Sequence, residues 1–210
     1  MMKNYVAVDT SGNHLCVVAC KNGKAYSVFL PDCAMKHSVS VMPAIDEVLK
    51  QADMSLDECD FFAAVVGAGS FTGIRIGISV VKGLCLAYGK PALPVTSFDV
   101  MAYTQKDGKV LCLVDALHGA YYACGYDGGK VSNAPAYLME NEILALQSDG
   151  YDLLSTATTP IAEQTNLTVV DPVAGLANAV EYLSAKDAFG ALTALYVRKS
   201  SAELNLEEKK

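Results

Sequence analysis

The chain has 210 residues, which is enough for one large domain or two small ones that bury a core without disulfides or metal. It is 52% hydrophobic and 19% charged, a balance that excludes a disordered or low-complexity chain. The formal charge is −7 and no long run of Lys or Arg occurs, which argues against direct nucleic-acid binding by the isolated chain. The apolar excess favours an oligomer interface, because such interfaces resemble a domain core cut in half.

The cysteines and histidines give no sign of a metal or disulfide framework. The seven cysteines are odd in number and include no CxxC pair, as expected for buried free thiols in a reducing compartment. The three histidines form no HxxxH or HExxH pair, so we expect no metal. No signal peptide and no run of 18 uninterrupted apolar residues is seen, so we expect a cytoplasmic chain outside the membrane.

The first half of the chain is predicted to alternate strands and helices. Asn22-Gly23 is a strong signal for a tight hairpin between two of the strands. Pro43 either opens the first helix or kinks it one turn in, and Gly89 ends the second helix. The apolar patterns predict strands at residues 5–10, 15–20, 25–30 and 61–67 with a short one in 91–97, and helices within 36–52 and 72–88.

After residues 104–109 a similar pattern begins again. We predict a strand at 110–117, a hairpin around Gly128-Gly129 and two helices. Asp9 and Asp115 each follow the first strand of their half, which suggests a duplicated α/β unit. The predicted domains are therefore residues 1–104 and a smaller second domain of residues 105–210.

A glycine-rich stretch separates the strand at 61–67 from the helix at 72–88. Residues 65–89 read VVGAGSFTGIRIGISVVKGLCLAYG, with glycines at 67, 69, 73 and 77. A strand, a glycine turn and a helix N-terminus can present N–H groups and a helix dipole to an anion, but the spacing is neither GxxxxGK[ST] nor GxGxxG. The alternative is that the glycines allow positive φ angles and close packing. The residues alone leave both hypotheses open.

The helix at 72–88 is apolar on two sides. One side carries Ile74 and Ile78, while the other carries Ile76, Val80 and Leu84. The first side can pack on its own sheet, and the second needs another cover, either the preceding helix or a partner chain. Gly73 and Gly77 are one turn apart and would let another backbone approach closely.

At GAGSFTGIRIG the sequence resembles the TsaB (YeaZ) family, the glycoprotease-like (peptidase M22-like) partner subunit of bacterial tRNA threonylcarbamoyladenosine biosynthesis. The resemblance extends over nearly the whole chain, and SFTG followed by RIG is its most specific part. Its ordered blocks are residues 7–12, 36–49, 70–77, 114–122 and 195–203.

The resemblance implies the fold of actin, Hsp70 and sugar kinases (ASKHA, ribonuclease H-like), with two similar α/β domains of which the second is reduced. In that superfamily the turn after the first strand faces phosphate. A vestigial phosphate- or nucleotide-facing site would then comprise Asp9, Thr10, Ser11, Gly67, Gly69, Ser70 and Asp115. Two family arginines are missing from this chain, before SFTG and after Asp115-Ala116, so we expect weak phosphate affinity.

The resemblance also implies a partner. The family's catalytic subunit holds a metal with an HxxxH pair, and Ser97 and Met101 stand at the matching positions here, which is no credible metal site. We therefore expect no catalytic residues and no cofactor bound by this chain, with ATP and metal supplied at partner subunits. The expected partner interface comprises Val41, Ile45, Gly73, Ile76, Gly77, Val80 and Leu84.

The implied function is that of a non-catalytic dimerisation and scaffold subunit. It would support formation of N6-threonylcarbamoyladenosine (t6A) at position 37 of tRNAs reading ANN codons. The implied partners are a TsaD-like threonylcarbamoyltransferase subunit and a small TsaE-like P-loop ATPase, with a homodimer when the chain is alone. The alternative is an ASKHA-type ATPase or kinase, or a glycoprotease-like enzyme, which the glycine loop and Asp9 would favour.

Overall fold

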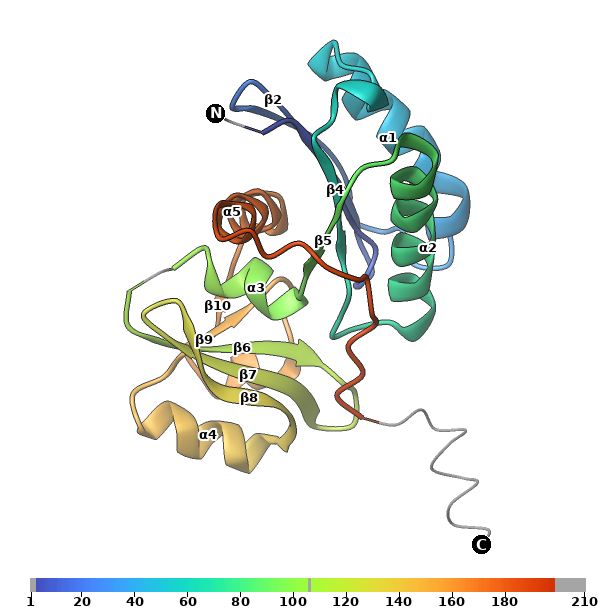
Figure 1. Cartoon of the computed structure of the whole chain (residues 1–210). Helices are drawn as coiled ribbons and strands as arrows, with labels where there is room; N and C mark the ends of the chain where they lie inside the picture. The colour runs from blue at the N-terminus through green and yellow to red at the C-terminus, as the bar shows by residue number, and fades with distance from the viewer. Residues whose placement is uncertain (1–2, 106, 199–210) are drawn as a thin grey trace, which may run out of the picture.

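The computed structural model describes residues 3–105 and 107–198, which form two five-stranded mixed sheets with helices packed on them (Figure 1). The strands are β1 (Tyr5–Asp9), β2 (Leu15–Lys21), β3 (Lys24–Leu30), β4 (Phe61–Val65), β5 (Ala92–Val95), β6 (Lys109–Asp115), β7 (Ala120–Asp127), β8 (Lys130–Met139), β9 (Asp152–Ser155) and β10 (Thr168–Val169). The helices are α1 (His37–Ala52), α2 (Phe71–Tyr88), α3 (Ser97–Ala102), α4 (Glu140–Ser148) and α5 (Pro172–Ala185), with short 3₁₀ turns at Leu56–Glu58 and Pro160–Glu163.

The two sheets have the same topology. The first sheet has the order β3-β2-β1-β4-β5, and the second has the order β8-β7-β6-β9-β10. In each sheet the first three strands in sequence pair antiparallel and the next two add in parallel. This repetition confirms the predicted α/β fold class and the duplicated unit.

The helices do not stay with the half of the chain that encodes them. α1 and α2 lie side by side on one face of the first sheet, and α5, from the C-terminal half, covers the opposite face (Figure 1). α3, from the N-terminal half, packs against β6 and α5. The boundary near residue 104 stays a prediction, but residues 172–185, counted with the second domain, pack on the first sheet.

Local sequence explains how α1 and α2 are positioned. Pro43 lies inside α1 rather than at its start, and the buried side of that helix includes Val41, Ile45 and Val48. Gly89 ends α2 at a φ of 63°, the left-handed conformation that a glycine cap adopts without strain. Both helices share one apolar core with the strands beneath them.

By length and composition alone, α2 is apolar enough to cross a membrane. In the fold, however, Ile74 and Val81 are fully buried in the core shared with the first sheet, while Arg75 and Lys82 are exposed. One buried apolar side and one exposed charged side are typical of a helix that covers a sheet in a globular protein.

Candidate functional site

The candidate site lies where the turn between β1 and β2 meets the start of α2. β1 pairs with β4, and α2 follows β4 after the glycine loop, so the fold places this turn against the N-terminus of α2. Ser70 is the N-cap of α2, and its hydroxyl accepts the backbone N–H of Gly73 at 3.2 Å. The site therefore combines two segments that the sequence singled out, the turn at residues 9–12 and the glycine-rich stretch at residues 67–77.

The four glycines of this loop are needed because other parts of the same chain press against them. A Cβ at Gly77 would lie 2.6 Å from Thr10 Oγ1, and one at Gly67 would lie 2.6 Å from the carbonyl oxygen of Leu195. Cβ atoms at Gly69 and Gly73 would lie well under 3.0 Å from the carbonyl oxygens of the turn. Gly67 and Gly69 also have φ angles of 120° and 148°, which side chains rarely adopt.

Hydrogen bonds fix the turn in this place. The Ser70 N–H donates to the Ser11 carbonyl oxygen at 2.7 Å, and Thr10 Oγ1 donates to the Gly73 carbonyl oxygen at 2.7 Å. An anion at this helix terminus would need N–H groups such as that of Ser70, which the chain's own carbonyl oxygen already occupies. Of the two hypotheses for the glycines, close packing is the one that this geometry supports.

Asp9 forms the polar centre of the site. Its Oδ1 accepts the Ser11 N–H at 2.8 Å and the Ser11 hydroxyl at 2.6 Å, and its Oδ2 lies 3.3 Å from His14 Nε2. Burial would raise the pKa of the Asp9 carboxyl, but hydrogen bonds and charge from His14 and Ser11 outweigh it, and the net pKa is lowered. Burial would lower the pKa of His14, and Asp9 outweighs this effect, so the net pKa of His14 is raised. The two groups therefore favour a buried carboxylate–imidazolium pair.

The serines and the histidine do not form a nucleophile–base pair. Ser97 Oγ donates to the Ala68 carbonyl oxygen at 2.6 Å and lies 3.1 Å from Ser11 Oγ. The Asp9 carboxylate lies between Ser11 and His14, and within the described part of the chain no hydrogen bond joins His14 to either serine. A serine hydrolase needs its base in hydrogen-bond contact with the hydroxyl, which this arrangement does not provide.

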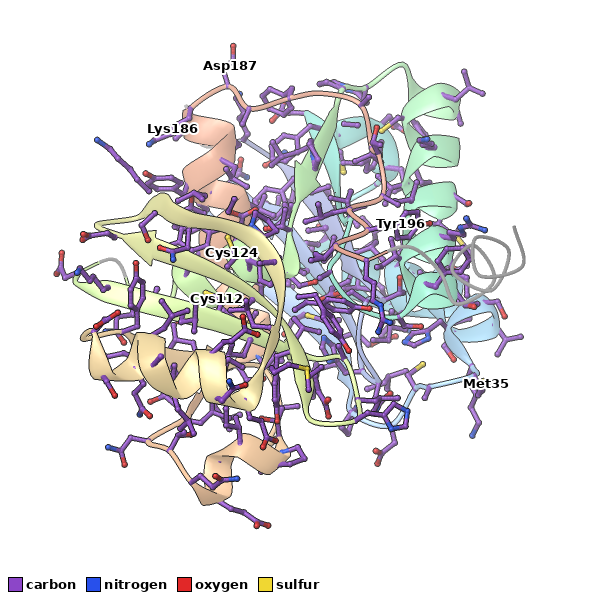
Figure 2. All side chains as sticks on the ribbon, turned by 90° about the horizontal axis from the view of Figure 1, so that it is seen from below. Met35, Cys112, Cys124, Lys186, Asp187 and Tyr196 are labelled. Carbon is purple, nitrogen blue, oxygen red and sulfur yellow. The ribbon has the colours of Figure 1, made fainter. Side chains whose placement is uncertain are left out.

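The C-terminal segment closes the other side of the glycine loop. The Leu195 N–H donates to the Val66 carbonyl oxygen at 2.7 Å. Tyr196 stacks on Phe71 at 5.0 Å between ring centroids, and Arg75 Nε donates to the Tyr196 hydroxyl at 2.8 Å. Tyr196 lies against the first turns of α2 (Figure 2). Of the block at residues 195–203, positions 199–203 lie outside the described residues.

Most of the predicted phosphate-facing residues lie together, where the β1–β2 turn packs against the glycine loop and the start of α2. Asp9, Thr10 and Ser11 contact the glycine loop or one another, whereas Asp115 is exposed and caps its own turn by accepting the Leu117 N–H at 2.7 Å. His14 was not predicted to take part. Its place five residues after Asp9, within one short interstrand turn, was the signal available in the sequence.

Most residues of the predicted partner interface lie inside the isolated chain. Five of its seven residues are buried in this chain's own core, because α1 and α2 bury them against the sheet and the β1–β2 turn: Val41, Ile45, Gly73, Gly77 and Leu84. Ile76 and Val80 are partly buried. The apolar side chains that α1 and α2 do expose include Val39, Met42 and Leu86. These three, with Ile76 and Val80, are named here the helix-pair surface.

Ser97 and Met101, which match the metal-ligand positions of the family's catalytic subunit, have other contacts in this structure. Ser97 is part of the hydrogen-bond network described above, and Met101 is fully buried in the core that α3 shares with the second sheet. Across residues 3–105 and 107–198, no group of three or more His, Cys, Asp and Glu side chains is placed to hold a metal ion.

Comparison with known proteins gives a consistent set of matches. The family model described as TsaD: tRNA N6-adenosine threonylcarbamoyltransferase matches residues 23–150, more than half of the chain. The chain is 32% identical over 125 residues to the tRNA threonylcarbamoyladenosine biosynthesis protein TsaB of Escherichia coli (strain K12), covering 58% of this chain and 54% of that protein. It is 29% identical over 119 residues to the protein of the same name from Bacillus subtilis (strain 168), covering 56% of this chain and 52% of that one.

The matched segment thus spans about half the length of these relatives. Among solved structures, YeaZ from Pseudomonas aeruginosa superposes with a TM-score of 0.79 at 23% identity, covering 93% of this chain and all of that one. This superposition extends the agreement in fold to both sheets.

Proposed function

Because the chain belongs to the tRNA N6-adenosine threonylcarbamoyltransferase family, in its TsaB (YeaZ) group, we propose that it supports t6A formation as a non-catalytic dimerisation and scaffold subunit. In this proposal it pairs with a TsaD-like transferase subunit that acts on adenosine 37 of tRNAs reading ANN codons. A TsaE-like ATPase completes the assembly, and the chain forms a homodimer when alone. The proposed compartment is the cytoplasm.

The helix-pair surface is the observation that carries this proposal. The side chains of Val39 and Leu86 are 70% and 87% exposed, although both lie on helices whose inner sides are fully packed. Val39 lies in the first turn of α1 and Leu86 in the last turn of α2, so a partner that contacts both would have to lie along the whole length of the two helices. Ile76 and Val80 add apolar area to the same pair of helices.

The site at Asp9 supports a non-catalytic role. Both carboxylate oxygens are engaged by groups of this chain, and the start of α2 is covered by the β1–β2 turn. In the proposal, the network fixes the orientation of α2, and thereby of the helix-pair surface. ATP and metal are bound at the partner subunits.

Light scattering tests the proposal on the full chain, alone and mixed with the cognate TsaD-like subunit. We expect self-association and a one-to-one complex for the wild type, and loss of both in Val39→Asp with Leu86→Asp. These two side chains are exposed, so the double variant should keep the wild-type circular dichroism and Tm. The control is Val131→Asp, which changes a 57% exposed valine on β8 and should leave association unchanged.

A wild-type chain that stays monomeric and ignores the partner would overturn the scaffold role. A double variant that still associates, or a control variant that fails as the double variant does, would overturn the helix-pair surface as the binding surface. Ile76→Asp and Val80→Asp are unsuitable tests, because both side chains pack in part against the core and their loss would also lower stability.

The buried Asp9–His14 pair is the one observation that favours an enzyme acting alone, as an ATPase, kinase or glycoprotease-like protein. If that alternative holds, the purified chain should turn over ATP or a peptide substrate without partners. Asp9→Asn should abolish that turnover while the fold is retained.

A further inference from the structure

A cavity opens at the end of the first sheet opposite to the Asp9 site. β1 runs from Tyr5 to Asp9, so these two residues mark the two ends of the strand. The cavity has a volume of about 270 Å³ and lies between the start of β1, the β2–β3 turn and the last turns of α5. Its lining residues are Lys3, Tyr5, Cys20, Gly23, Glu181, Ser184 and Ala185. At about 30 Å³ per water, it can hold a ligand with on the order of nine non-hydrogen atoms.

The phenol of Tyr5 is the unexplained polar group beside this cavity. Tyr5 is 2% exposed, and its hydroxyl has no hydrogen-bond partner within the described residues. The groups that act on it electrostatically, Cys20 and Glu181, line the same cavity, and burial raises the pKa of the phenol so that it keeps its proton. Buried hydroxyls in folded proteins are nearly always hydrogen-bonded, so this one calls for a partner.

Charges of both signs border the same space. Lys3 Nζ lies 3.9 Å from Asp187 Oδ1 and 4.5 Å from the centroid of the Phe189 ring. Asp187 is a weak partner, because its side chain is 89% exposed and points away from the protein (Figure 2). Over residues 3–105 and 107–198, no ion pair involves Glu181, which lies near the C-terminal end of α5, where the helix dipole favours a cation.

We propose that this cavity binds a small zwitterion of the α-amino acid class. The Glu181 carboxylate binds the ammonium group, Lys3 exchanges Asp187 for the ligand's carboxylate, and the Tyr5 hydroxyl hydrogen-bonds to the ligand. Cys20 and Ala185 provide an apolar wall for the side chain of the ligand. The proposal is independent of the proposed function, because the cavity shares no residue with the helix-pair surface or with the Asp9 site.

Isothermal titration and ligand-observed NMR on the full chain test it with four probes. Glycine and L-leucine carry both charges, isoamylamine lacks the carboxylate of leucine, and isocaproate lacks its amine. We expect at least one of the two amino acids to bind, and the two single-charge probes to bind at least about tenfold more weakly.

Tyr5→Phe should weaken amino acid binding about fivefold and Glu181→Gln about tenfold, since a neutral and a charged hydrogen bond are lost. The matched control is Thr159→Val, which removes another buried hydroxyl that has no hydrogen-bond partner among the described residues and does not line this cavity. Tyr5→Phe keeps the packing of the ring on Phe61, so its Tm should match the wild type. The proposal is overturned if neither amino acid binds, because the cavity then holds water only. It is also overturned if Tyr5→Phe and Glu181→Gln both bind amino acids as the wild type does.

Discussion

Replacing Gly73 by alanine tests whether the β1–β2 turn and α2 are locked together. A Cβ built on Gly73 would lie 2.0 Å from the Thr10 carbonyl oxygen, whereas ordinary van der Waals contact is 3.4–4 Å. The obstacle is backbone and cannot rotate away, so α2 or the turn must move by more than an ångström. Gly83 offers a matched control, because it lies in the same helix and a Cβ there would meet nothing within 4 Å.

At Gly73 a gain in helix propensity opposes a steric overlap and a lost hydrogen bond in the free energy of unfolding. Gly to Ala inside a helix stabilises by about 1 kcal/mol, which is the full effect expected for Gly83→Ala. At Gly73 the overlap costs about 1–3 kcal/mol, and separating the segments also breaks the 2.7 Å hydrogen bond from Thr10 to Gly73, which is worth about 1 kcal/mol. We therefore expect Gly73→Ala to lower the free energy of unfolding by about 1–3 kcal/mol.

Urea unfolding of the two variants and the wild type, followed by circular dichroism, measures these changes. The two alanines gain similar helix propensity, so Gly73→Ala should have a lower free energy of unfolding than Gly83→Ala only if the turn packs against α2. If Gly73→Ala is as stable as Gly83→Ala, the turn is not packed against α2 as described. The internal explanation for the glycines would then be refuted.

Two further predictions concern the Asp9–His14 pair and the C-terminal segment. Folding raises the pKa of His14, so its ion pair with Asp9 stabilises the folded state. This stabilisation is complete below the unfolded pKa of about 6.5 and is lost as the pH rises through the folded pKa. Because the folded pKa of Asp9 is lowered, the stabilisation that its carboxylate contributes is lost only in acid, below about pH 3.9. The wild type should therefore lose stability to urea as the pH rises above about 6.5. His14→Gln should flatten that dependence on pH, and an unchanged dependence would contradict the pair. Tyr196→Ala should speed amide exchange at Leu195 about tenfold by removing the stack on Phe71 and the Arg75 contact. The Gly190 amide, bonded to the Ala92 carbonyl oxygen, is the internal control, and equal acceleration at both amides would mean general destabilisation instead.

Local patterns were sufficient for the larger elements. The three opening strands, α1, β4, α2 with its Gly89 cap, and the β7–β8 hairpin follow from apolar spacing and turn residues, because those features are set by a few adjacent residues. Shorter elements were missed. α3 has six residues and β10 has two, too few for a periodic signal. Thr96 and Asp99 form a capping box at the start of α3, and that spacing was readable in the sequence.

The sequence by itself determined the α/β class, the repeated strand–Asp–turn–strand unit and the importance of the glycine loop, since each depends on residues close together in the chain. Tertiary structure alone decided what meets that loop. The contacts of Gly73 with Thr10 and of Gly67 with Leu195 join residues more than 60 and 120 positions apart. No local pattern encodes such pairs, because they arise when the two sheets and the returning C-terminal segment pack together. The same packing buried Val41 and Leu84 in the core and left Val39 and Leu86 exposed.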